Sequence, residues 1–172
     1  MAQRTDVFDL GRLQLSSGQA RRVDLLVEVE RLEFGGQAYA PVEARTPVVL
    51  DAARTRSGYS LRVRYGVRLH GPCMRCLEDA HADMDIDARE IDQPGGGDDL
   101  TSPYVDGDEL DLRSWARDAL ALALPTQIVC RADCAGLCPT CGANLNEAGP
   151  DHVHEREPDP RWAKLGELEL DG

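Results

Sequence analysis

Residues 61–88 read LRVRYGVRLHGPCMRCLEDAHADMDIDA and contain the clearest structural pattern in the chain. Apolar and polar side chains alternate from Leu61 to Leu69 and again from Ala80 to Ala88. Alternation with a period of two is typical of a strand with one buried face. The segment between the runs begins Gly-Pro-Cys-Met-Arg-Cys at residues 71–76. The pattern therefore predicts an antiparallel hairpin with two cysteines at its tip.

The polar face of this hairpin carries both signs of charge. Both apolar faces must point at one core, so both polar faces point the same way. This places three arginines across from three aspartates: Arg62, Arg64, Arg68, Asp83, Asp85 and Asp87. One hypothesis is a basic strand face that meets RNA. The interpretation we favour is a cross-strand charge ladder, in which each pair contributes about 0.2–1 kcal/mol.

Outward from the hairpin, the chain predicts a few further elements. An apolar run at residues 23–29 precedes a turn at Gly35-Gly36, and residues 42–50 form a β-branched, apolar strand with Pro47 as an edge-strand signal. Helical spacing predicts a helix at residues 111–124, which Pro125 ends, and residues 159–165 predict a short second helix. Residues 93–99 are a flexible acidic loop.

These elements predict an α+β fold with a mainly antiparallel sheet, one or two helices and a zinc-held C-terminal region. The expected division is a sheet-and-helix core domain at residues 1–125, with the Cys73-Cys76 knuckle at its hairpin tip. A Cys/His-rich, zinc-binding region at residues 126–172 is expected to pack back on this core.

The composition indicates how large the hydrophobic core can be and in which cellular compartment the protein is expected. The chain has 172 residues, of which 42% are hydrophobic and only 5% aromatic, so one modest core of Leu, Val and Ala is expected. The first ten residues have no apolar run, and no stretch approaches the roughly 18 apolar residues of a membrane span. We therefore expect a cytoplasmic protein with no membrane partner, whose cysteines stay reduced and bind metal rather than form disulfides.

The net charge of −12 is divided unevenly along the chain. Residues 1–70 carry a balance of +3, and residues 71–172 carry −15. Nucleic-acid binding depends on Lys and Arg that release counterions from phosphates. Any RNA contact is therefore expected in the first half, while the acidic half is solvated or faces a basic partner such as a ribosomal protein.

The placing of the cysteines predicts metal binding. Two residues between cysteines let a tight turn present both sulfurs to one ion, and a following glycine lets backbone amides approach the sulfur. The candidate ligands are six cysteines and two histidines, enough for one or two Zn²⁺ ions: Cys73, Cys76, Cys130, Cys134, Cys138, Cys141, His152 and His154.

The sequence leaves the pairing of these ligands open. The preferred pairing joins the two Cys-x2-Cys motifs, so that one ion takes Cys73, Cys76, Cys138 and Cys141 and a second takes Cys130, Cys134, His152 and His154. The alternative puts Cys130, Cys134, Cys138 and Cys141 on one ion and leaves Cys73 and Cys76 as a free dithiol.

Catalytic chemistry has little support in this sequence. A thiolate-rich set of four ligands leaves no open position on the metal, and neither a phosphate-binding glycine loop nor a nucleophile elbow is present. We therefore expect no catalytic residues and no small-molecule substrate. A thioredoxin-like role for Cys73-x2-Cys76 would need the motif to open a helix, whereas here it joins two strands.

Four parts of the chain resemble the YceD family of bacterial and plastid proteins. They are the strand and Cys-x2-Cys-Leu turn at residues 69–77, Leu-Ala-Leu-Pro at 122–125, the cysteine block at 130–146, and Asp-Pro-Arg-Trp-Ala-x-Leu at 159–165. Many family members carry Cys-x-Cys where this chain has His152-x-His154, and that exchange keeps ligand chemistry.

The resemblance implies a non-enzymatic accessory factor for accumulation of large-subunit ribosomal RNA. Its implied partners are the precursor of that RNA or ribosomal proteins. The alternative function is a zinc-dependent protein-interaction or thiol redox-sensing module.

Overall fold

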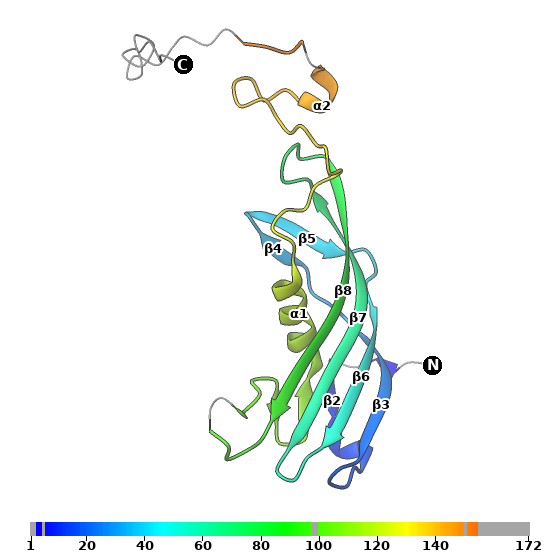
Figure 1. The fold of residues 1–172 in the computed structure, drawn as a ribbon. Coiled ribbons are helices and arrows are strands. Elements are labelled where there is room, and N and C mark those ends of the chain that lie inside the picture. The colour runs from blue at the N-terminus through cyan, green and yellow to red at the C-terminus, as the bar shows by residue number, and fades with distance from the viewer. Residues whose placement is uncertain (1–2, 5, 98–99, 150, 155–172) are drawn as a thin grey trace, which may run out of the picture.

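The computed structural model describes residues 3–4, 6–97, 100–149 and 151–154. Within them the chain forms a mainly antiparallel β-sheet with two α-helices, as the sequence predicts (Figure 1). The main sheet contains β1 (Gln3–Arg4), β3 (Ala20–Val27), β4 (Leu32–Phe34), β5 (Gln37–Pro41), β6 (Thr46–Arg54), β7 (Tyr59–Pro72) and β8 (Asp79–Asp92). A smaller sheet contains β2 (Val7–Asp9), β9 (Val105–Asp106) and β10 (Glu109–Asp111). The helices are α1 (Leu112–Ala123), α2 (Leu145–Ala148) and the 3-10 helix η1 (Leu10–Leu13).

The predicted hairpin is confirmed, and its strands extend beyond the two runs of alternating apolar and polar residues. β7 pairs antiparallel with β8 from Tyr59 opposite Asp92 to Pro72 opposite Asp79. Leu61, Val63 and Leu69 are at most 1% exposed on the inner face, because the alternation directs every second side chain to the core. The cysteine turn follows Pro72, so Cys73 and Cys76 lie at the tip of the two longest strands.

The edge-strand interpretation of Pro47 is wrong. β6 lies inside the sheet, with β3 on one side and β7 on the other. Pro47 pairs with Leu26 of β3, but pairing with β7 begins only at Val49. The proline therefore stands where β6 has a single partner strand, and a proline lacking an N–H donor is tolerated there.

The charge ladder on the outer face is present, with changed partners. Arg68 lies opposite Asp83, and its Nε donates to the Asp83 Oδ1 at 2.6 Å, as the hairpin pattern predicts. Arg62 lies opposite Arg89 instead and reaches diagonally to Asp87. Arg64 donates to the carboxylate of Asp51 on β6, while Asp85 lies opposite Gly66 and makes no ion pair within the described part of the chain.

The predicted helix at residues 111–124 is confirmed as α1, which packs against the inner face of the sheet beside β8 (Figure 1). Asp111 caps its N-terminus, since the carboxylate accepts hydrogen bonds from the backbone N–H and the hydroxyl of Ser114. Trp115 is 2% exposed in the core. The hydroxyl of Tyr65 on β7 donates to the Ala116 carbonyl, which ties the helix to the sheet.

Residues after α1 lead to the hairpin tip and to α2, at one end of an elongated molecule (Figure 1). The predicted helix at residues 159–165 lies outside the described residues. The division into domains at residues 125 and 126 stays a prediction. Within the described ranges, no helix is long and apolar enough to cross a membrane.

Candidate metal centre

The turn between β7 and β8 presents the first two candidate ligands. The Cys73 N–H donates to the Glu78 carbonyl at 2.6 Å, and the Leu77 N–H donates to the Cys73 carbonyl at 3.0 Å. Leu77 takes a left-handed conformation with φ of 65° to close the turn. Cys73 and Cys76 are 0% and 3% exposed, so both thiols point inward from a compact loop.

Two backbone hydrogen bonds attach this turn to the C-terminal segment. The Met74 N–H donates to the Ile128 carbonyl at 2.9 Å, and the Leu137 N–H donates to the Arg75 carbonyl at 3.0 Å. These bonds bracket Cys130 and Cys134 on both sides. The segment therefore passes the hairpin tip with its first two cysteines held against the turn.

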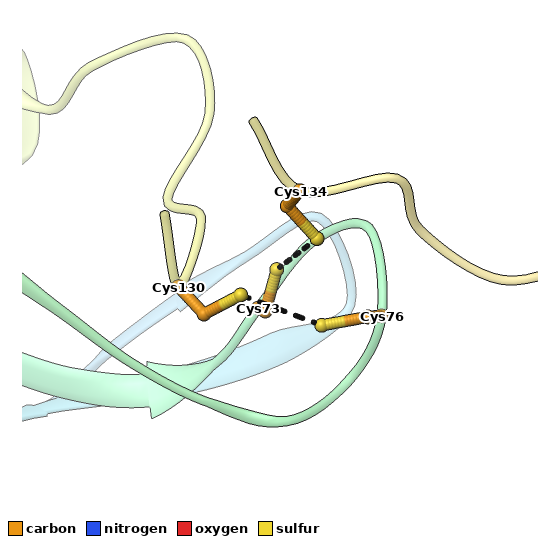
Figure 2. A group of neighbouring side chains, drawn as sticks. All are labelled: Cys73, Cys76, Cys130 and Cys134. Atoms are coloured by element: carbon orange, nitrogen blue, oxygen red, sulfur yellow. Dashed lines mark hydrogen bonds between the residues drawn. The ribbon is translucent and has the colours of Figure 1, made fainter. Parts of the chain in front are cut away.

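Four sulfur atoms meet at this junction (Figure 2). The Sγ atoms of Cys73 and Cys134 lie 3.8 Å apart, those of Cys76 and Cys130 lie 3.6 Å apart, and all four lie within 4.8 Å of one another. A tetrahedral zinc with Zn–S bonds of about 2.3 Å requires sulfurs about 3.8 Å apart. We call this group the four-cysteine cluster, and its spacing fits one tetrahedral ion.

The environments of the four thiols shift their pKa values in different directions. Burial raises the pKa of Cys73, but backbone N–H donors outweigh burial and lower that pKa to about 6. The Asn146 side chain is the main cause that lowers the pKa of Cys134. Desolvation and the neighbouring thiols raise the pKa of Cys130 to about 12. Since a divalent cation compensates the charge of closely spaced thiolates, this donor set fits Zn²⁺.

A second group lies farther along the C-terminal segment. The Cys138 N–H donates to the Ala143 carbonyl and the Gly142 N–H donates to the Cys138 carbonyl, both at 2.8 Å. Gly142 has φ of +75°, a conformation that glycine adopts without steric cost. These bonds form the predicted knuckle and place Cys138 and Cys141 on the same side of the turn.

His152 and His154 complete this group, which we call the Cys2His2 cluster. The Nε2 atoms of His152 and His154 lie 3.4 and 3.3 Å from the Cys141 Sγ, and 3.1 Å from each other. All four ligand atoms lie within 4.8 Å of one another. Backbone N–H donors of Cys141 and Thr140 lower the pKa of Cys138 to about 6. The cluster offers two sulfurs and two nitrogens, a set that also suits tetrahedral zinc.

Both pairings expected from the sequence are wrong. The structure joins Cys73 and Cys76 to Cys130 and Cys134, and joins Cys138 and Cys141 to the two histidines. The physical reason is the order in which the chain passes the hairpin tip. Cys130 and Cys134 arrive first and are held there by the Met74–Ile128 and Arg75–Leu137 hydrogen bonds.

Two residues that the sequence did not single out support the four-cysteine cluster. Asn146 on α2 donates from Nδ2 to the Cys134 Sγ at 3.5 Å, while its Oδ1 accepts from the Ala135 N–H at 2.8 Å. Arg75 donates from its guanidinium to the Cys134 carbonyl at 3.0 Å. Asn146 lies in the cysteine block that resembles the family motif, and this resemblance could have marked it as a residue of the site. Nothing in the sequence marked Arg75, because its hydrogen bond to the Cys134 carbonyl forms only when the C-terminal segment lies against the hairpin tip.

Comparisons with known proteins find relatives in mycobacteria and in a plant. A protein of Mycobacterium tuberculosis is 39% identical over 104 residues, which cover 57% of this chain and 49% of that protein. A protein of Mycobacterium leprae is 34% identical over 103 residues, covering 56% of this chain and 46% of that protein. The large ribosomal RNA subunit accumulation protein YCED homolog 1, chloroplastic, of Zea mays is 30% identical over 173 residues, covering 80% of this chain and 57% of that protein.

The chain spans about half the length of the curated relatives it matches. No solved structure matches it. The family model described as large ribosomal RNA subunit accumulation protein YceD matches residues 61–169, from the start of the hairpin through both ligand clusters. On that match, which covers more than half of its residues, the chain belongs to the YceD family.

Proposed function

We propose that this chain is a zinc-binding, non-enzymatic accessory factor for the accumulation of large-subunit ribosomal RNA. The family description and the name of the maize relative support a role connected with that RNA. The observation that carries the zinc assignment is the convergence of six sulfur and two nitrogen ligand atoms into two sets of four. Each set has the donor number of a closed structural zinc site, and such a site has no open position for a substrate.

The role proposed for the metal is structural. The four-cysteine cluster takes two ligands from the hairpin and two from the C-terminal segment, so one ion there would fasten the segment to the sheet. The Cys2His2 cluster would hold residues 138–154 in one conformation. The cytoplasm is the compartment we expect, because thiolate ligands need reducing conditions.

The experiment that tests the RNA role is depletion of the protein in growing cells. The ratio of large- to small-subunit ribosomal RNA is expected to fall, and the wild-type chain is expected to restore it. Affinity purification, with the RNA sequenced and the proteins identified, is expected to recover precursors of the large subunit. An unchanged RNA ratio together with recovery of no large-subunit component would refute the proposed role.

A thiol redox-sensing module is the second candidate, and the exposure of Cys141 favours it. Hydrogen peroxide could take two electrons from Cys138 and Cys141, which would form a disulfide and release the ion of the Cys2His2 cluster. Reversible zinc release at low peroxide, accompanied by a change of bound partner, would support this candidate. Zinc retention under the same treatment would rule out the redox-sensing function.

A further inference from the structure

The outer face of the main sheet has a hollow where β3, β6, β7 and β8 lie side by side. Its volume is about 470 Å³. Small residues form part of its lining, including Ala20, Ala53 and Ser60. Three arginines of the outer face line it, Arg22, Arg62 and Arg89, whereas Arg21, which lies opposite the buried Ala52, belongs to the other face of β3. We call this feature the arginine hollow.

Strand register explains why three of these arginines lie in one row. Arg22 lies opposite Asp51, Asp51 lies opposite Arg62, and Arg62 lies opposite Arg89. Neighbouring strands are about 4.8 Å apart, so this row extends about 14 Å across the sheet. Like charges directly opposite each other destabilise a sheet. The pair formed by Arg62 and Arg89 therefore costs stability unless an anion compensates it.

The carboxylates near the row compensate only part of the charge. Arg22 donates to Asp51 and Arg62 donates to Asp87, both at 2.7 Å. Those hydrogen bonds are the main reason that the pKa values of Asp51 and Asp87 are lowered, so both carboxylates stay charged and orient the guanidinium groups. Arg89 makes no ion pair within the ranges that the structure describes, although its charge also helps to lower the pKa of Asp87.

The local charge is opposite to that of the whole chain. Three outer-face arginines and one aspartate line the hollow, in a protein of net charge −12. A second hollow on the same face, beside Gly66, is lined by Arg68 with Glu43, Asp83 and Asp85 and is negative. Positive charge is therefore concentrated in the arginine hollow and is not a general property of the outer face.

We propose that the arginine hollow binds the phosphate backbone of RNA, an inference that rests on the proposed function and gives it a contact surface. Guanidinium groups bind phosphate oxygens in a bidentate geometry. A row of about 14 Å is long enough to contact more than one phosphate of a nucleic-acid strand. Arg89 at the exposed rim contacts phosphates, and Arg22 and Arg62 are held in place by their carboxylates. This surface is expected to bind RNA without base specificity, because its arginines contact phosphates and not base edges.

The test compares two double variants of the full-length, zinc-loaded chain. R22Q/R89Q removes two arginines of the row, and R12Q/R31Q removes two exposed arginines that do not line the hollow and that pair with Asp9 and Glu33. Both change the net charge equally. The probe is a fluorescent single-stranded RNA of about 16 nucleotides, with binding measured from low to moderate salt.

R22Q/R89Q is expected to weaken RNA binding about tenfold or more and to lower the log–log salt slope by about 1.5 units, because two phosphate contacts are lost. R12Q/R31Q is expected to bind within about twofold of wild type. Equal losses in the two variants would overturn the proposal, because they would show a response to net charge alone. Polyglutamate that competes as well as RNA at equal charge would also overturn it, in favour of an acidic protein partner.

The cellular version separates this inference from the proposed function. In depleted cells, R12Q/R31Q should restore large-subunit RNA and R22Q/R89Q should restore it poorly, with both variants at equal protein level and zinc content. Full restoration by R22Q/R89Q would overturn the arginine hollow while the proposed function stands. Failure of the wild-type chain itself to restore the RNA would count against the proposed function.

Discussion

At the scale of single residues, the ligand sets have unequal environments. In the four-cysteine cluster Cys73, Cys76 and Cys134 are buried and only Cys130 is exposed, while in the Cys2His2 cluster only Cys138 is buried. A cluster with three buried ligands exchanges its ion more slowly, because solvent and chelators reach those sulfurs only when the segment opens. The two ions are therefore expected to leave at different rates.

Paired substitutions test which ligands share an ion. C73S/C76S and C130S/C134S should each remove about one zinc equivalent, because both pairs belong to the four-cysteine cluster. The quadruple variant should lose no more zinc than either pair, since the Cys2His2 cluster is left intact. Elemental analysis of protein purified without chelators under reducing conditions measures this content. Additive losses from the two pairs would contradict the pairing in the structure.

The thiol pKa values predict how zinc affinity changes with pH. The pKa of Cys73 is lowered to about 6 and that of Cys130 is raised to about 12. At neutral pH, zinc must displace the Cys130 proton but not the Cys73 proton. As pH falls through about 6, Cys73 also becomes protonated, so affinity should fall more steeply with pH. Competition titrations on C138S/C141S, which isolates the four-cysteine cluster, should show this change of slope, and a constant slope from pH 8 to pH 5 would contradict it.

At the scale of elements, α1 is held to the sheet by packing and by one buried hydrogen bond. Its apolar side packs on the core through Leu112, Trp115 and Leu120. The Tyr65 hydroxyl donates to the Ala116 carbonyl from the middle of β7. Burial raises the pKa of Tyr65, so its hydroxyl stays protonated and keeps its role as donor at all physiological pH values.

Tyr65→Phe should lower the free energy of unfolding by about 1–2 kcal/mol, because it leaves the buried Ala116 carbonyl without this donor. Tyr104→Phe is the matched control. Its hydroxyl donates to Asp118 at 3.1 Å in a partly exposed position, so we expect a loss of about 0.5 kcal/mol or less. Urea unfolding of the two variants gives the comparison. A larger loss from Tyr104→Phe would show that the Tyr65 contact is not an anchor of the helix.

At the scale of the whole molecule, the two ends of the structure depend on different forces. The sheet, α1 and the small sheet share one hydrophobic cluster of buried residues. A second, smaller cluster surrounds the hairpin tip and consists largely of ligand cysteines with Tyr39, Ala80 and Ile128. Few apolar side chains stabilise the tip without the metal, so metal and fold should be coupled there.

Chelation should therefore loosen residues 126–154 and leave the sheet folded. Hydrogen exchange is expected to accelerate at amides such as those of Met74, Leu137 and Gly142, while amides of β6 and the middle of β7 keep their protection. The Cys2His2 cluster should lose its ion first because its ligands are more exposed. Readdition of zinc should restore protection, and loss of protection in β6 on chelation would show that the metal supports the whole fold.

The sequence by itself determined the hairpin, α1, the turn at Gly35-Gly36 and the identity of the candidate ligands. Each is encoded over a few neighbouring residues, in the alternation from Leu61 to Leu69, the helical spacing before Pro125 and the short gaps between cysteines. Gly35 and Gly36 adopt φ of 60° and 77° between β4 and β5, as a tight turn requires.

Only the tertiary structure decided how these parts meet. The central place of β6, the Arg22–Asp51 and Arg62–Asp87 ion pairs, and the row of charges in the arginine hollow depend on strand register. The pairing of cysteines depended on which part of the C-terminal segment docks at the hairpin tip. Spacing fixes which ligands share a turn, but the backbone hydrogen bonds between distant segments fix which turns share an ion.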